Sequence, residues 1–322
     1  MTTPPARVAV VGCGVIGSGW ASRFALAGCD VTISDPSPDA PRIAAEVHAN
    51  ARHAWHQLGL STDAQGDVTF APLPEAVANA ELVQESVPER LAMKREVFAS
   101  IEAHASPDAL IASSTSGFRP TELQRQMANP ERLVVGHPFN PVYLLPLVEV
   151  VGGEASSGAS VDRAMGMYDA VGMKPLHVRV EIDAFIADRL LEAVWREALW
   201  LVNDGVATTG EIDDAIRYGF GLRWAQMGLF DTYRVAGGEA GMRHFIAQFG
   251  EALSWPWTKL TDVPELTDDL IDTISDQSDA QSGHRSVREL ERIRDENVAA
   301  ILRALESNRW GAGETLAAFR DR

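Results

Sequence analysis

The sequence predicts two domains of different class: an α/β domain with a doubly wound, mostly parallel sheet in residues 1–182, and an all-helical domain in residues 183–322. Three observations support this division. In the first part, short β-branched apolar runs alternate with stretches of helical periodicity. A glycine-rich loop follows the first of these runs. From Asp183 onward, apolar residues recur only at helical spacing.

Each expected strand of the first domain is a short apolar run that ends at a glycine, a proline or a polar cluster. The strands are expected at Val8–Val11, Val31–Ser34, Leu82–Val83, Leu110–Ala112, Leu133–Val135 and Leu147–Val151, and helices at Ser18–Ala27, 41–60 and Ala92–His104.

In the second domain, capping residues mark the expected helix ends. Asp183 is a candidate N-cap and Gly205 a candidate C-cap of a first helix of about five turns. Thr208 and Glu211 form a capping-box pattern that opens the next helix. A long amphipathic segment, Ser286–Ser307, follows near the end of the chain.

Composition excludes several classes of protein. The chain has 322 residues and a net charge of −17, which argues against a nucleic-acid partner. No run approaches the ~18 apolar residues of a membrane span. Cys13 and Cys29 form no disulfide framework and are expected to be small buried residues in a reducing compartment, so the expected location is the cytoplasm. No metal is expected.

The loop Gly12-Cys13-Gly14-Val15-Ile16-Gly17 follows a predicted strand and precedes a predicted helix. Asp35 ends the next strand, eighteen residues after Gly17. This context is typical of a Rossmann-type dinucleotide site, in which the glycines permit a tight turn, a close approach of the pyrophosphate and close helix packing. Asp35 would accept hydrogen bonds from the ribose hydroxyls and repel a 2′-phosphate. The expected cofactor is therefore NAD, bound in part by Val15 and Ile16.

His137 is the candidate general base, and Glu149 follows it twelve residues later across a short loop. A carboxylate on one imidazole nitrogen fixes the tautomer, so the other nitrogen can take a proton from a hydroxyl. The segment Pro138–Pro141 is expected to form a rigid turn, and Ser113–Gly117 follows a strand whose carboxyl end should face the cofactor. An inert histidine at a strand end is the alternative interpretation.

Several separated motifs together resemble the 3-hydroxyacyl-CoA dehydrogenase family, over roughly residues 6–235. They are the glycine loop with Asp35, Glu85–Glu89 with Lys94, Ser113–Gly117, His137–Pro141 with Glu149, and Phe185–Arg189. The resemblance implies that His137 is the general base and Glu149 its orienting partner. It also implies that Ser116 and Asn140 bind the reacting oxygen, and that Glu89 and Lys94 lie along the cofactor.

Two departures from the family pattern argue against a CoA thioester as substrate. Asp188 stands where the family usually has asparagine, and an ionised aspartate cannot donate to a thioester carbonyl. The helical arm 46–66 contains no lysine. Residues 218–225 and 292–305 resemble the short branch of the family that acts on free hydroxyacids, which includes L-gulonate and L-carnitine 3-dehydrogenases.

Within that branch, residues 137–146 with 184–189 most resemble the carnitine enzymes. This implies NAD-dependent oxidation of L-carnitine to 3-dehydrocarnitine. A trimethylammonium group favours aromatic faces, and Arg223 could bind the substrate carboxylate. The candidates near the cation are Tyr143, Asp188, Phe220 and Trp224, with Trp195, Tyr233, Trp255 and Trp257 as further aromatics. For each aromatic residue, core packing is the alternative; for Asp188 it is an ion pair with adjacent arginines, and for Arg223 a surface or interface position.

Other functions remain open from the sequence. A sugar acid such as L-gulonate, or 3-hydroxybutyryl-CoA, could be the substrate. A non-catalytic, crystallin-like structural protein is a third possibility, although the presence of His137, Glu149, Ser116 and Asn140 argues against it. The resemblance also implies a homodimer.

Overall fold

The structure is a computed structural model that describes residues 3–63, 65–236, 241–249 and 287–321, with isolated positions between 258 and 284. The chain forms two compact units. The first comprises residues 1–186 together with 292–322, and the second comprises residues 187–291.

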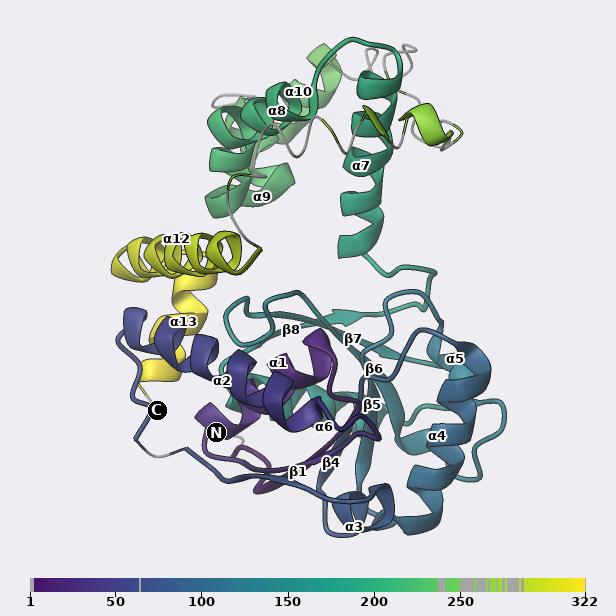
Figure 1. The fold of residues 1–322 in the computed structure, drawn as a ribbon. Helices are drawn as coiled ribbons and strands as arrows, with labels where there is room; N and C mark the ends of the chain where they lie inside the picture. The colour runs from purple at the N-terminus through teal and green to yellow at the C-terminus, as the bar shows by residue number, and fades with distance from the viewer. Residues whose placement is uncertain are drawn as a thin grey trace. The chain divides into compact units, whose positions relative to one another are not determined.

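The first unit is built on one eight-stranded sheet with the order β3-β2-β1-β4-β5-β6-β7-β8 (Figure 1). The pairs from β3 to β6 are parallel, β6 and β7 are antiparallel, and β7 and β8 are parallel. The strands are β1 (Arg7–Val11), β2 (Asp30–Ser34), β3 (Val68–Phe70), β4 (Leu82–Glu85), β5 (Leu110–Ser113), β6 (Leu133–Pro138), β7 (Leu147–Gly152) and β8 (Lys174–Val178). The predicted mostly parallel, doubly wound sheet is confirmed.

Helices cover both faces of this sheet because successive strand residues point to opposite sides. One apolar layer joins β1 residues such as Val10 to Trp20 and Phe24 on one face. The other joins Ala9 and its neighbours to Phe98 and Ile101. The first layer holds α1 (Val15–Leu26), α2 (Ala40–Gln57) and α6 (Gly158–Ala170), and the second holds α3 (Leu73–Val77), α4 (Leu91–His104) and α5 (Pro120–Gln124).

The C-terminal segment belongs to the first unit, which corrects the predicted assignment of residues 183–322 to a single domain. Helices α12 (Val287–Ser307) and α13 (Ala312–Arg320) place Leu302 and Leu316 in an apolar cluster with Trp55 of α2. The helical periodicity of this segment was recognised in the sequence. Its packing partner was not, because periodicity identifies an apolar face and not what covers it.

Arg23 of α1 joins these distant segments. Its guanidinium is buried and donates to the carbonyl oxygens of Val171 at 2.9 Å and Tyr143 at 3.2 Å, and also to that of Gly172. It also lies over the rings of Trp55 and Phe319, at 5.5 and 5.9 Å from their centroids. Burial lowers the pKa of Arg23 to about 10, so the side chain remains charged at neutral pH.

The second unit is helical in the part that the structure describes. It contains α7 (Ala187–Asn203), α8 (Thr209–Ala215), the π-helical turn η2 (Ile216–Phe220), α9 (Gly221–Ala236) and α10 (Gly241–Phe249). The capping box of Thr208 and Glu211 is confirmed. Asp183 is not the N-cap of α7, because Ala184 and Phe185 adopt positive φ angles that interrupt a helix before Ala187. Among the described helices, none is long and apolar enough to cross a bilayer.

We predict that Arg23→Lys destabilises the first unit. The planar guanidinium of Arg23 donates to three carbonyl oxygens and lies over two rings, and a lysine ammonium cannot make all of these contacts. The free energy of unfolding should therefore fall by about 2–3 kcal/mol. Urea unfolding followed by tryptophan fluorescence measures this change. Exposed Arg52 provides the matched control, and Arg52→Lys should stay within about 0.5 kcal/mol of wild type. Equal effects of the two substitutions would contradict this role of Arg23.

Candidate active site

The loop between β1 and α1 has the geometry that the glycine pattern predicts. Gly12 has φ +94°, and a Cβ there would lie 2.7 Å from the carbonyl oxygen of Ser86. A Cβ on Gly17 would lie 1.8 Å from the carbonyl oxygen of Gly12, so both positions require glycine. A Cβ on Gly14 would meet no protein atom within 4 Å. Gly14 therefore leaves open space directly before the N-terminus of α1, where an anion is favoured.

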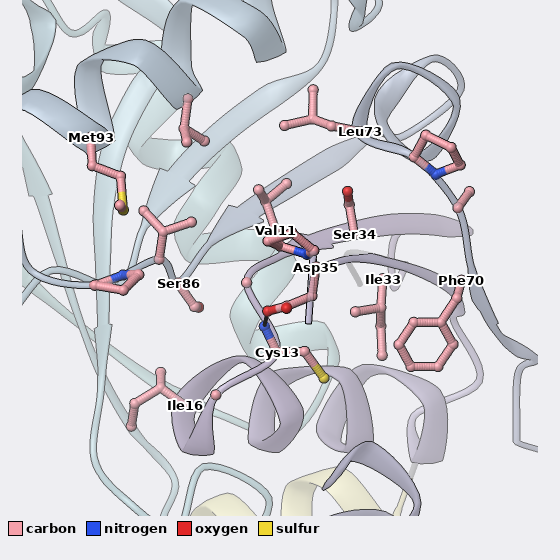
Figure 2. Close-up of a pocket in the computed structure, with 18 of the residues that line it drawn as sticks. Val11, Cys13, Ile16, Ile33, Ser34, Asp35, Phe70, Leu73, Ser86 and Met93 are labelled. Atoms are coloured by element: carbon pink, nitrogen blue, oxygen red, sulfur yellow. Dashed lines mark hydrogen bonds between the residues drawn. The ribbon is translucent and has the colours of Figure 1, made fainter. Parts of the chain in front are cut away.

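Asp35, at the end of β2, holds this loop in place. Its Oδ2 accepts a hydrogen bond from the backbone N–H of Cys13 at 2.6 Å, and its Oδ1 accepts one from Ser37 at 2.7 Å. Figure 2 shows the first of these bonds on the wall of a cavity. Each carboxylate oxygen can accept a further bond, so Asp35 can still receive the hydroxyls of a ribose.

The cavity has a volume of about 1110 Å³ and lies along the carboxyl ends of β1, β2 and β4. Ile33 and Phe70 line it on one side of Asp35, and Ser86 and Met93 line it on the other (Figure 2). Val15 and Ile16 also contribute to the lining. A long cavity with apolar walls, an open glycine and an acidic residue fits an adenine, a pyrophosphate and a ribose diol. The residues present therefore fit NAD.

Lys94 and Glu89 do not line this cavity. Lys94 is buried, and its Nζ lies 2.8 Å from Oε1 of Glu85 and 3.3 Å from Oε2 of Glu89. The same ammonium donates to the carbonyl oxygen of Val87 at 3.3 Å. Lys94 thus stabilises the 86–88 loop, which does form part of the cavity wall.

His137 lies at the end of β6, between a carboxylate and a hydroxyl. The antiparallel register pairs His137 with Glu149 of β7. Nδ1 of His137 is 2.9 Å from Oε2 of Glu149, and Nε2 is 3.1 Å from Oγ of Ser116. Glu149 has an exposed fraction of 0% and His137 of 4%, whereas Ser116 is exposed. The predicted pairing of His137 and Glu149 is confirmed by this geometry.

Glu149 has a second hydrogen-bond partner that sequence reasoning missed. Its Oε1 accepts from the backbone N–H of Ile186 at 2.9 Å. The positive φ angles of Ala184 and Phe185 direct that N–H inward. The ring of Phe185 is buried, with its centroid 5.5 Å from that of His137, and Phe139 lies at the same distance. The motif beginning at Phe185 is the sequence signal that could have indicated these contacts.

Asn140 and Tyr143, two further residues predicted to contact the substrate, lie in different surroundings: one is exposed and the other is buried. Asn140 is exposed in the loop after β6. Tyr143 was predicted to lie near the substrate cation, and the structure corrects this placement. Tyr143 is buried, and its hydroxyl donates to Oδ2 of Asp295 on α12 at 2.5 Å. It therefore has no free ring face for a cation, because α12 and the Trp55 cluster cover it.

In the second unit, Phe220 and Trp224 lie together, with ring centroids 4.6 Å apart. Arg223 is exposed, and Asp188 is half-buried in the first turn of α7. Trp195 is 53% exposed and is therefore not a core residue. Tyr233 stacks on Phe245. Trp255 and Trp257 lie outside the described residues.

No group of three His, Cys, Asp or Glu side chains in the described part of the chain is arranged to hold a metal ion. The sheet order, the glycine loop and the acidic residue after β2 define the first unit as a Rossmann-type NAD-binding domain.

Comparison with known proteins identifies the family. Residues 7–182 match the NAD binding domain of 3-hydroxyacyl-CoA dehydrogenase, and residues 185–269 match the C-terminal domain. The chain belongs to the 3-hydroxyacyl-CoA dehydrogenase family.

Among similar proteins, an L-carnitine dehydrogenase/betainyl-CoA thioesterase of Agrobacterium fabrum is 62% identical over 98% of this chain, which spans 65% of that relative's length. An L-carnitine dehydrogenase of Pseudomonas putida is 55% identical over 95% of both chains. This chain thus spans 64–65% of the length of relatives of this two-part type.

Solved structures agree on the fold. An NAD⁺-dependent 5-formyl-3-hydroxy-2-methylpyridine 4-carboxylic acid 5-dehydrogenase matches with a TM-score of 0.79 and 27% identity, covering 94% of this chain and 98% of that one. A 3-hydroxybutyryl-CoA dehydrogenase of Escherichia coli matches with a TM-score of 0.59 and 25% identity, covering 80% of this chain and 54% of that one.

We predict that Gly14→Ala weakens NAD binding without destabilising the fold. The new methyl group would enter space that no protein atom occupies, where the pyrophosphate approaches the backbone. The dissociation constant for NAD should rise at least about tenfold, as measured by calorimetric titration. The thermal unfolding midpoint should not change.

Gly158 is the matched control, because a Cβ at this position also meets nothing within 4 Å. Gly158→Ala should leave both NAD affinity and the unfolding midpoint unchanged. Normal NAD affinity in Gly14→Ala would show that the pyrophosphate does not lie against this loop.

Proposed function

We propose that this protein is an NAD-dependent dehydrogenase that oxidises the 3-hydroxyl of L-carnitine and yields 3-dehydrocarnitine. The observation that carries this proposal is His137, held between Glu149 and Ser116 at the end of β6. Relatives of 55–62% identity that are named as L-carnitine dehydrogenases support the choice of substrate. In the net reaction, NAD⁺ takes up a hydride, and the hydroxyl proton is released to solvent after passing through the protein.

The Glu149 carboxylate accepts a hydrogen bond from Nδ1–H of His137, which leaves the lone pair of Nε2 as the acceptor. In the absence of substrate, the Ser116 hydroxyl donates to this lone pair. A substrate hydroxyl that donates to Nε2 replaces it and frees the Ser116 proton. Ser116 can then donate to the substrate oxygen while His137 takes the proton.

Glu149 stabilises the imidazolium that results, and its hydrogen bond from Ile186 keeps the carboxylate in place. Bound NAD supplies the hydride acceptor. Asn140 is proposed as a second donor to the substrate oxygen, because it lies in the exposed loop directly after β6.

The trimethylammonium group is proposed to bind Phe220 and Trp224, which form a contacting aromatic pair. An aromatic face contributes ~0.5–2 kcal/mol to binding a cation. Asp188 adds a carboxylate, and the exposed guanidinium of Arg223 is a partner for the substrate carboxylate. A cytoplasmic location is proposed as well, since both cysteines are free and buried, as in a reducing compartment.

We predict that the purified protein reduces NAD⁺ with L-carnitine. Absorbance of NADH at alkaline pH measures turnover, with D-carnitine, L-gulonate and 3-hydroxybutyryl-CoA as competing substrates. Turnover on L-carnitine alone supports the proposal. Preferred turnover on gulonate or the CoA ester, or NAD binding with no turnover on any of the four, would contradict it.

Two variants connect this activity to the site. His137→Ala removes the proton acceptor and should lower kcat at least about 1000-fold, while Glu149→Gln removes the charge that stabilises the imidazolium and should lower it at least about 100-fold. His177, an exposed histidine on β8, gives the control variant His177→Ala, which should retain full turnover. All three should keep normal NAD affinity.

A homodimer is proposed from the apolar side chains of the second unit. Leu191, Trp195 and Phe230 are 56%, 53% and 75% exposed. Sedimentation velocity should give a dimer for the wild type and a monomer for Leu191→Asp/Phe230→Asp. Val180→Asp, at a 72% exposed position of the first unit, should remain dimeric. A monomeric wild type would contradict the proposal.

A further inference from the structure

A polar network of half-buried and buried side chains lies at the carboxyl ends of β4 and β5, and one of its members lines the cavity. Its centre is Oγ of Ser114, which accepts hydrogen bonds from Nε1 of Trp20 at 3.1 Å and from Nε2 of Gln84 at 2.8 Å. Oγ of Ser86 lies 2.9 Å from the same oxygen. Ser86 lines the cavity, whereas Gln84 is fully buried.

Tyr168 fixes the orientation of the Gln84 amide. The tyrosine hydroxyl is buried and lies 2.6 Å from Oε1 of Gln84. Desolvation raises the pKa of Tyr168, so the phenol keeps its proton and donates it. On the other side, Nε2 of Gln84 donates to the carbonyl oxygen of Gly136 at 3.4 Å. A reversed amide would place two carbonyl oxygens together and deprive the Tyr168 proton of this acceptor.

The direction of the hydrogen bond between Ser114 and Ser86 follows from the number of donors and acceptors around Ser114. A serine oxygen has two lone pairs and one proton. Trp20 and Gln84 take both lone pairs of Ser114, because indole N–H and amide N–H can only donate. The proton of Ser114 must therefore go to Oγ of Ser86, which acts as the acceptor. The proton of Ser86 is then directed elsewhere, and no acceptor for it lies within the described part of the chain.

Ser86 follows β4, where the strand order of the sheet reverses beside β1. A dinucleotide crosses this point, with its adenosine half on the side of β2 and Asp35. Ser86 lies on the opposite side of Asp35 from Phe70 (Figure 2). We propose that Ser86 donates a hydrogen bond to an oxygen of the nicotinamide ribose or of the adjoining phosphate of NAD. This inference rests on NAD binding and not on the identity of the alcohol substrate.

The variant Ser86→Ala tests the proposal in calorimetric titrations without an alcohol substrate. Loss of one hydrogen bond should raise the dissociation constants for NAD and ADP-ribose about 3- to 20-fold. The constant for 5′-AMP, which lacks the nicotinamide ribose and its phosphate, should stay within about twofold of wild type. Ser160→Ala is the matched control, because the Ser160 hydroxyl donates to the carbonyl oxygen of Glu131 and does not line the cavity. All three dissociation constants should stay within about twofold of wild type in this variant.

A second variant separates a direct contact from a displaced loop. Ser114→Ala deprives Trp20 and Gln84 of an acceptor but leaves the Ser86 hydroxyl. It should lower the thermal unfolding midpoint and weaken NAD binding less than Ser86→Ala. The proposal is overturned if Ser86→Ala binds NAD within twofold of wild type, if it weakens 5′-AMP equally, or if Ser114→Ala weakens NAD equally. Because no substrate is present, these outcomes are independent of turnover on L-carnitine.

Discussion

The contact between Nδ1 of His137 and Oε2 of Glu149 is the interaction on which the candidate site depends. It joins two adjacent strands in the antiparallel part of an otherwise mostly parallel sheet. Glu149 is fully buried, and a buried carboxylate is costly unless it is paired and hydrogen-bonded. His137 and the backbone N–H of Ile186 meet that requirement. The geometry that keeps the carboxylate stable in the fold also fixes the orientation of the imidazole that we propose as the proton acceptor.

The adjacent Gly136 links this pair to the nucleotide cavity. A Cβ at Gly136 would lie 2.0 Å from the hydroxyl oxygen of Tyr168. Glycine therefore allows Tyr168 to reach Gln84, and Gln84 connects through Ser114 to Ser86 on the cavity wall. One end of the sheet thus carries both the proposed proton acceptor and the polar network that we propose contacts the cofactor.

The features that the sequence predicts correctly are those whose residues lie close together along the chain. The glycine loop, Asp35 and the alternation of strands and helices follow from patterns that each span a short stretch of the chain. Glu149 was predictable because a short loop joins β6 and β7, so antiparallel partners lie close in sequence. The contacts of Arg23 and the Gln84–Tyr168 bond could not be found in this way. The hydrogen-bond partners of Arg23 lie up to 149 residues away from it, and Gln84 and Tyr168 lie 84 residues apart. Tyr143 was misplaced for the same reason, since the helix that buries it lies near the end of the chain.

The tautomer of His137 tests the central claim most directly. Nitrogen-15 NMR of histidine-labelled protein, with His137→Gln to assign the resonances, reports which ring nitrogen carries the proton. We expect a neutral ring protonated at Nδ1, with an unprotonated Nε2 facing Ser116. A neutral ring protonated at Nε2 would contradict the account, because that nitrogen could not then accept the proton of a substrate hydroxyl.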